Sequence, residues 1–187
     1  MARPRKFDEE RAVDAALEAF WTAGYEATST QDLCEATGLG RSSIYNTFHS
    51  KQDLFRRSLA RYMERMTSEQ VELMEGEAPV REKVGKLLDD VLRTAGRGCL
   101  SVNTAIELAG RDPEIADMLH KDNERRVAAV RAAIEAGQRA GEVDRDKDAA
   151  TLARFFVSTV GGLRVSVRNG TGPRQLRAVA DTALALL

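Results

Sequence analysis

Apolar residues recur every three to four positions along almost the whole chain, and this spacing predicts an all-α protein. In the first such stretch Val13, Leu17, Phe20 and Trp21 fall at i, i+4, i+7 and i+8, so they share one face of a helix. No stretch has the strict alternation of apolar and polar residues that is typical of a β-strand. Glycine, proline and aspartate separate the periodic stretches, which indicates about nine helices.

Capping residues predict where the N-terminal helices begin and end. Asp8 can cap the first helix and Gly24 can end it. The run Thr28-Ser29-Thr30-Gln31 fits the S/T-x-x-E/Q capping box, and Gly38 ends the short helix that follows. Ser50 is the expected cap of a long helix. The first four helices are thus expected over residues 8–23, 28–38, 41–48 and 51–74.

The run Glu75-Gly76-Glu77-Ala78-Pro79 interrupts the helical spacing and indicates a connection. The long helix before it is expected to link a small N-terminal domain, residues 1–50, to a larger domain, residues 51–187. The same signals predict five further helices, over residues 79–96, 99–109, 112–140, 148–169 and 173–187.

Composition narrows the class of protein. Hydrophobic residues make up 43% of the 187 residues and charged residues 30%, which suits a packed globular protein. No apolar run approaches the roughly 20 residues needed to span a bilayer, and the first residues, MARPRKFDEE, lack the apolar segment of a secretory signal. We therefore expect a cytoplasmic protein without a membrane partner.

The charge of the chain is balanced, with 28 basic and 29 acidic residues and a net charge of −1. Nucleic-acid binding would therefore have to come from a local patch rather than from a global basic field. Arg3, Arg5 and Lys6 form one such patch, which is either a solvated tail or an arm that reaches for phosphates.

The second and third predicted helices have the length and spacing of a helix-turn-helix, joined by the turn Gly38-Leu39-Gly40. In that motif the second helix lies in the major groove of DNA. Leu39, Ile44 and Phe48 would face inward and hold it. Its exposed face would present donors suited to phosphates and base edges, namely Arg41, Ser42, Ser43, Tyr45, Asn46 and His49.

Lys51 stands just after the cap of the long helix, where a cation costs about 0.3–1 kcal/mol when exposed. The same turn carries unpaired backbone N–H groups, so a DNA phosphate could lie between those donors and the ammonium. An ordinary surface lysine is the alternative interpretation.

Residues 7–59 resemble the DNA-binding domain of the TetR (tetracycline-repressor-like) family. The resemblance rests on Gly24-Tyr25, Gly38-Leu39, Ile44-Tyr45 and the run from Phe48 to Leu54, FHSKQDL. It implies a two-domain helical protein, usually a homodimer that binds a palindromic operator and usually represses. Separately, no cofactor or metal is expected. Gly40, where the family often has serine, and Cys34, which replaces a smaller residue, depart from the pattern.

The family pattern puts Tyr45 and Lys51 on the phosphate backbone and Ser42, Ser43 and Asn46 near the groove. With the donors already named, the expected DNA-contacting residues are Thr28, Gln31, Arg41, Ser42, Ser43, Tyr45, Asn46, His49 and Lys51.

The C-terminal half resembles the family in layout and in the local run Gly98-Cys99-Leu100, Asn103, Glu107 and Asp112-Pro113. That layout implies a cavity for a small-molecule effector, which releases the operator, and a dimer interface made by the last two helices. Candidate effector-binding residues are Tyr62, Cys99, Asn103, Glu107 and Phe155. The alternative interpretation, which the sequence supports equally well, is that Asn103 and Glu107 are ordinary residues on the polar face of a helix.

The two cysteines, Cys34 and Cys99, are too few for a disulfide framework, and reduced thiols are expected. Cys99 falls at a predicted helix start, a position that favours a thiolate. It is therefore either a sensor of oxidants or electrophiles or a structural thiol.

Gly161-Gly162 lies inside a predicted helix, where each glycine costs roughly 1 kcal/mol relative to alanine. Close approach of a second subunit would compensate, although an intramolecular crossing or a kink is also consistent. The expected dimer interface comprises Phe156, Gly161, Gly162, Leu163, Val179 and Leu184.

An enzyme is disfavoured because the sequence contains no phosphate-binding loop, HExxH or GxSxG motif. The two histidines, His49 and His120, are far apart in the sequence. A helical module that binds only proteins would account for the core but not for the donors around Tyr45 and Lys51. We therefore predict a homodimeric, ligand-responsive repressor.

Overall fold

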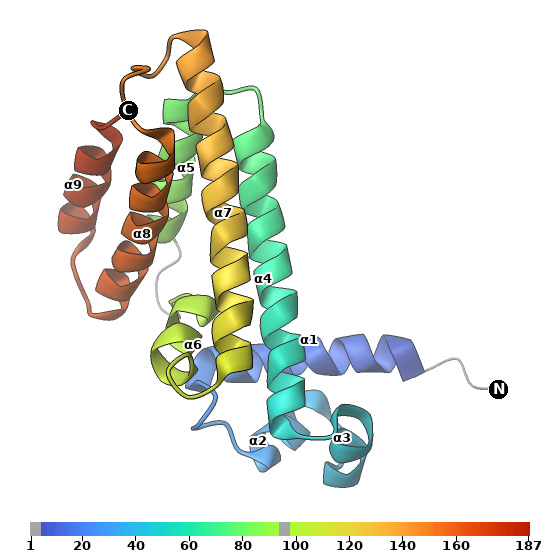
Figure 1. The fold of residues 1–187 in the computed structure, drawn as a ribbon. Coiled ribbons are helices and arrows are strands. Elements are labelled where there is room, and N and C mark those ends of the chain that lie inside the picture. The colour runs from blue at the N-terminus through green and yellow to red at the C-terminus, as the bar shows by residue number, and fades with distance from the viewer. Residues whose placement is uncertain (1–4, 94–97) are drawn as a thin grey trace. The chain divides into compact units, whose positions relative to one another are not determined.

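The chain folds into helices joined by short connections (Figure 1). The computed structural model describes residues 5–93 and 98–187, and within these ranges it contains nine helices and no strand. The prediction of an all-α protein is confirmed. The helices are α1 (Arg5–Ala23), α2 (Thr30–Thr37), α3 (Arg41–Phe48), α4 (Lys51–Glu75), α5 (Val80–Arg93), α6 (Leu100–Leu108), α7 (Pro113–Ala140), α8 (Ala149–Arg168) and α9 (Pro173–Leu184).

The beginnings of the first two helices differ from those expected, and those of α5, α6, α7 and α8 lie one residue later than expected. Helix α1 begins at Arg5, before Asp8, so Asp8 is a residue of the helix rather than its cap. The capping box of α2 is shifted by one residue, because the Thr28 hydroxyl donates to the carbonyl of Gly24 at 2.6 Å. Ser29 is therefore the N-cap, and Asp32 completes the box. The end predicted at Gly96 lies outside the described residues.

The chain is divided into two compact units. One consists of Met1–Glu64 and Cys99–Ala116, and the other of Arg65–Gly98 and Asp117–Leu187. Helix α6 thus belongs to the same unit as the helix-turn-helix, although it is far from it in sequence. The division into a DNA-binding domain, residues 1–50, and a ligand-binding domain, residues 51–187, remains a functional prediction.

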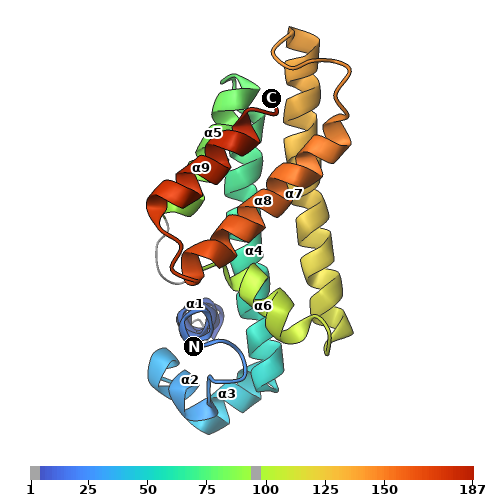
Figure 2. The ribbon, with the colours of Figure 1, turned by 90° about the vertical axis from the view of Figure 1, so that its left-hand side faces the viewer.

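The core of the first unit is an aromatic cluster under the helix-turn-helix. The rings of Phe20 and Phe55 meet edge to face with centroids 5.0 Å apart, and Tyr25 lies 4.9 Å from Phe55. Phe20 and Phe55 are almost completely buried, and each such side chain contributes about 1.5–3 kcal/mol through burial. Figure 2 looks along α1 and shows α2 and α3 on one side of it.

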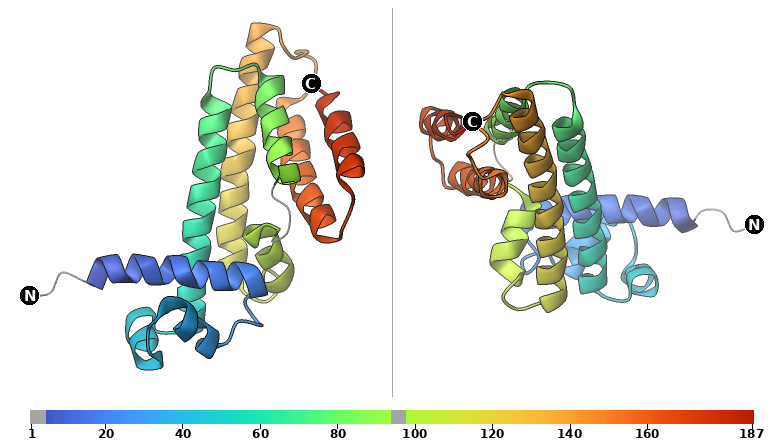
Figure 3. Two further views of the ribbon diagram at one scale, coloured as in Figure 1. Left: turned by 180° about the vertical axis from the view of Figure 1, so that it is seen from behind. Right: turned by 45° about the horizontal axis from the view of Figure 1, so that its top comes forward.

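The core of the second unit is formed by apolar faces of α5, α7, α8 and α9. Val84, Leu88, Ile134 and Phe156 are fully buried in it. Helices α5, α8 and α9 contact one another, and Figure 3 shows them side by side. In the described ranges, none of the helices combines the length and the apolar character that a transmembrane segment requires.

Candidate nucleic-acid interface

The helix-turn-helix is held by local backbone chemistry. The Ser29 hydroxyl accepts the N–H of Asp32 at 3.1 Å, and the Asp32 carboxylate accepts the N–H of Ser29 at 2.7 Å. Hydrogen bonds to the carboxylate from the Ser29 backbone N–H and, to a lesser degree, from the Ser29 side chain lower the pKa of Asp32. Gly38 ends α2 with φ +70° and donates its N–H to the carbonyl of Cys34, a left-handed geometry that glycine adopts without strain.

Helix α3 presents its polar side outward. Ile44 and Phe48 point into the first unit and are 1% and 0% exposed, as the sequence predicts. Gly40 is the N-cap and supplies no side-chain acceptor, and the first turn carries no acidic residue. The positive end of the helix dipole is therefore uncompensated. The exposed side chains on this helix are Arg41, Ser42, Ser43, Tyr45 and Asn46.

Tyr45 is oriented by its neighbours on both helices. Its hydroxyl lies 3.2 Å from the hydroxyl of Thr30 on α2, and the Arg41 guanidinium lies 5.8 Å from the ring centroid. The hydrogen bond with Thr30 and, to a lesser degree, the Arg41 charge lower the pKa of Tyr45. Thr30 was missed by sequence reasoning, because only the packing of α2 against α3 brings it to Tyr45.

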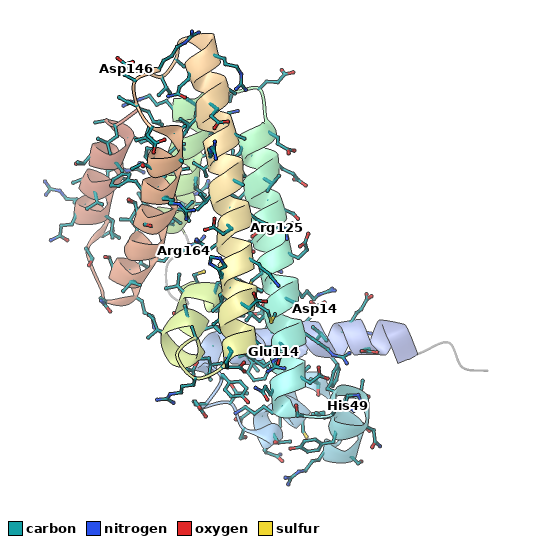
Figure 4. All side chains as sticks on the ribbon, viewed as in Figure 1. Asp14, His49, Glu114, Arg125, Asp146 and Arg164 are labelled. Carbon is teal, nitrogen blue, oxygen red and sulfur yellow. The ribbon has the colours of Figure 1, made fainter. Side chains whose placement is uncertain are left out.

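His49 occupies the connection between α3 and α4. Its φ of +57° is the only positive φ of a non-glycine residue in the described ranges. The side chain is exposed at the end of α3 (Figure 4). Ser50 follows, and its hydroxyl accepts the N–H of Asp53 at 3.0 Å. The predicted cap of α4 is confirmed.

Lys51 finds two partners within the first unit. Its ammonium lies 3.4 Å from the carbonyl oxygen of Glu26 and 4.4 Å from the centroid of the Tyr25 ring. Both interactions favour a cation, so they offset the repulsion by the helix dipole. The chain thus holds the Lys51 ammonium beside the turn that joins α1 to α2.

The other two expected DNA contacts lie on α2 and in the turn before it. Gln31 is exposed, and its amide donates to Glu35 at 2.9 Å. Thr28 is only 1% exposed and is engaged with Gly24. The structure therefore gives the Thr28 hydroxyl a role in the turn and does not present it on the surface.

The candidate effector-binding residues fall into separate places. The Tyr62 hydroxyl donates to the sulfur of Cys99 at 3.4 Å, and both residues are 2% exposed. Asn103 is half-buried on α6, one turn from the N-cap Cys99. Phe155 is 40% exposed on α8. The fold therefore brings Tyr62 to Cys99, and Asn103 is near Cys99 through the helix that they share.

Glu107, the fifth candidate, binds the protein backbone. Its two carboxylate oxygens accept the N–H groups of Tyr25 and Glu26 at 3.1 and 2.8 Å. Gly24 precedes these residues with φ +89°, and a Cβ there would come within 3.2 Å of the carboxylate. Glycine thus provides both the backbone conformation and the room for this contact.

The candidate dimer residues lie on two sides of α8 and α9. Phe156 and Leu163 are buried in the core of their own chain, and Leu184 packs against that core. By contrast, a Cβ at Gly161 or Gly162 would meet no described atom within 4 Å. Close intramolecular packing therefore does not account for these glycines. The exposed apolar residues on these helices are Phe155, Val165 and Val179.

A buried polar network in the second unit was not expected from the sequence. The Asp122 carboxylate accepts hydrogen bonds from the Thr67 hydroxyl at 2.5 Å and from the Arg126 guanidinium at 2.9 Å. All three residues are at most 8% exposed. The i, i+4 spacing of Asp122 and Arg126 indicates a salt bridge, but sequence patterns do not distinguish a buried pair from a surface pair.

Comparisons with known proteins agree with this arrangement. Residues 12–57 match the family model of bacterial regulatory proteins of the tetR family, and residues 86–183 match that of the tetracyclin repressor-like C-terminal domain. The transcriptional repressor ComR of Escherichia coli (strain K12) is 30% identical over 98% of this chain and 90% of its own length. The uncharacterized regulator YezE of Bacillus subtilis (strain 168) is 28% identical over the full length of both chains.

Solved structures extend the comparison. A cysteine mutant of the TetR family transcriptional regulator CifR, complexed with a 26-bp double-strand operator DNA, is 30% identical. The match covers 98% of both chains with a TM-score of 0.85. A TetR regulator from Chloroflexus aurantiacus shares the fold with a TM-score of 0.86 at 23% identity. The chain belongs to the tetR family of bacterial regulatory proteins.

Proposed function

We propose that this protein is a homodimeric repressor that binds a palindromic DNA operator through α3 and is released by a small-molecule effector. One observation carries the DNA-binding part of the proposal. The exposed face of α3 is a continuous set of donors beside an uncompensated helix N-terminus, and buried Ile44 and Phe48 anchor the opposite face. The operator complex of the related CifR supports the same function.

Within this interface Arg41, Tyr45 and Lys51 bind phosphates, and Ser42, Ser43 and Asn46 lie toward the base edges. Gln31 and His49 flank the same surface. We leave Thr28 out of the surface, because its hydroxyl is buried and bound to Gly24. Two such faces in one dimer would enter major grooves about 34–36 Å apart, one turn of the duplex.

Dimerisation is proposed through the outer sides of α8 and α9. The glycines Gly161 and Gly162 leave open space that a second helix can fill, and Phe155 on α8 and Val179 on α9 supply exposed apolar surface on the same two helices. Phe156, Leu163 and Leu184 support this surface from within the subunit. Two-fold symmetry would place the same residues on both sides of the contact.

The effector region is proposed around Tyr62, Cys99 and Asn103. These residues combine a buried hydroxyl–thiol contact with a half-buried amide at the N-terminal end of α6. An effector bound there would act on operator affinity through a conformational change, and linkage requires the operator to weaken effector binding equally.

Selection of genomic fragments with the purified full-length protein tests the function. We expect one or a few fragments to be enriched, with an affinity that falls steeply as salt rises. On such a fragment, Arg41→Ala should weaken binding about tenfold or more, since a charged contact is worth about 1.5–3 kcal/mol.

Arg139→Ala is the matched control, because Arg139 is an exposed arginine in the last turn of α7. It should leave the affinity unchanged. No enrichment of any fragment at low salt would contradict DNA binding and favour a protein-only partner. Equal effects of the two alanine variants would contradict the interface on α3.

A further inference from the structure

The carboxylate of Glu107 on α6 is bound to the backbone of the turn between α1 and α2. It accepts the consecutive N–H groups of Tyr25 and Glu26, from residues more than 80 positions earlier in the chain. Charge-assisted hydrogen bonds of this kind are about twice as strong as neutral ones. The side chain therefore fixes the turn to α6 at a single point.

This turn also holds the cation that is proposed to bind phosphate. The ring of Tyr25 and the carbonyl of Glu26 are the two groups that contact the Lys51 ammonium. Their N–H groups are the two that Glu107 binds. A shift of the turn relative to α6 would therefore displace the partners of Lys51.

Cys99 is the N-cap at the opposite end of α6, and its sulfur accepts a hydrogen bond from the hydroxyl of Tyr62. Cys99 and Glu107 are eight residues apart, about 12 Å along a helix. Cys99 and Glu107 therefore lie at the two ends of one short helix, and a movement of α6 as a rigid body would displace both.

We propose that Glu107 is a positioning residue for DNA binding, which couples the N-terminal end of α6 to the phosphate contact made by Lys51. With Glu107 bound to the turn, Lys51 is held in the geometry that grips the operator. When α6 moves, the contact breaks and the operator is released. The proposal rests on the DNA-binding function proposed above and adds the residue through which that function is regulated.

Glu107→Gln tests the positioning role, because it keeps the length of the side chain and replaces one acceptor by a donor. Operator affinity should fall by about 5- to 150-fold, the usual range of coupling between sites. Simple electrostatics predicts the opposite sign, since the substitution removes a negative charge near DNA.

Glu26→Gln provides the matched control. Glu26 lies on the same turn, and its carboxylate is exposed and 4.0 Å from Arg111. This variant removes the same charge but leaves the Glu107 contact intact, so its affinity should be unchanged or higher. Equal changes in the two variants would overturn the proposal.

The salt dependence separates a positioning role from general destabilisation. If Lys51 loses its phosphate in Glu107→Gln, the slope of log affinity against log salt should become shallower by about 1. Lys51→Met should show the same slope, and the double variant should be no worse than either single variant. An unchanged slope in Glu107→Gln would contradict the coupling to Lys51.

Alkylation of Cys99 by N-ethylmaleimide tests the coupling from the other end of α6. Operator DNA should slow this reaction in the wild-type protein, and peptide mass spectrometry separates Cys99 from Cys34. In Glu107→Gln the effect of DNA on Cys99 should largely disappear. Equal protection by DNA in both proteins would overturn the coupling.

Amide hydrogen exchange without DNA distinguishes failure of this proposal from failure of the proposed function. The N–H groups of Tyr25 and Glu26 should exchange faster in Glu107→Gln than in the wild type, whether or not the protein binds DNA. Unchanged exchange would show that the contact does not hold the turn. Faster exchange without any DNA binding would retain the contact and reject the function.

Discussion

Lys51 follows the cap of α4, at a helix end that repels a cation. The structure supplies two compensating partners, the Glu26 carbonyl and the Tyr25 ring. Since both belong to the turn before α2, neither is adjacent to Lys51 in sequence. The sequence indicates that the positive charge of Lys51 needs a compensating partner. The fold supplies part of this compensation from within the chain.

The neighbouring hydroxyl groups of Thr28 and Ser29 have different roles, one in the turn before α2 and the other at the N-cap of α2. The S/T-x-x-E/Q pattern predicts Thr28 as the cap of α2. Thr28 is drawn into the turn by the carbonyl of Gly24, which leaves the cap to Ser29. The shift of one residue therefore follows from the left-handed turn at Gly24.

The buried pair Asp122–Arg126 leads to a prediction at the residue scale. Asp122→Asn should lower the free energy of unfolding by about 3–5 kcal/mol, because the guanidinium of Arg126 would remain buried without its counter-charge. Urea unfolding measures the change. Asp117→Asn is the control, since Asp117 forms an exposed pair with Lys121 and should cost less than about 1 kcal/mol. Similar losses in the two variants would contradict the buried pair.

At the scale of elements, α8 shows what helical periodicity predicts and what it leaves open. Phe155 and Phe156 are adjacent and chemically alike, but about 100° apart around the helix axis. Phe156 lies in the core and Phe155 is 40% exposed. Helical periodicity predicts that two adjacent rings face different directions, and the packing of α8 on α5 and α9 decides which ring is inside.

A second element-scale feature is the approach of α7 to the start of α5. A Cβ at Gly137 would lie 2.7 Å from Cγ1 of Val80. Gly137→Ala should therefore destabilise the protein by about 1–3 kcal/mol through overpacking, despite the better helix propensity of alanine.

Thermal and urea unfolding of Gly137→Ala provide the measurement, and Gly137→Ala combined with Val80→Ala supplies the check on mechanism. The double variant should relieve part of the steric strain between positions 137 and 80, although it also loses the apolar contacts of Val80. A Gly137→Ala protein as stable as the wild type would contradict this close approach.

At the scale of the whole molecule, the proposed dimer depends on the open surface at Gly161 and Gly162. Gly162→Glu should give monomers, because it places a charge in a helix contact without changing the core of its own subunit. Operator affinity should then fall, since each monomer grips only one half-site.

Light scattering measures the mass of Gly162→Glu, and circular dichroism checks that it remains folded. Ala132→Glu, which adds one negative charge at an exposed position of α7 outside the proposed interface, tests whether charge alone separates subunits and should leave the protein dimeric. A folded Gly162→Glu protein with the mass of a dimer would contradict the interface.

The sequence by itself determined the all-α class, the positions of nearly all helices and the helix-turn-helix with its outward donors. These features depend on interactions between residues close in the chain, such as helical periodicity, caps and glycine turns. The prediction that Lys51 and Tyr45 contact DNA therefore needs no knowledge of the packing between helices.

Only the tertiary structure decided where Glu107 binds, that Thr28 and the Asp122–Arg126 pair are buried, and which of Phe155 and Phe156 faces outward. The burial of Thr28 is determined by the geometry of the turn at Gly24. Each of the other outcomes depends on a group more than 30 residues away or on packing between helices. A local pattern specifies which face of a helix is apolar, but the partner of a polar side chain is specified by the fold.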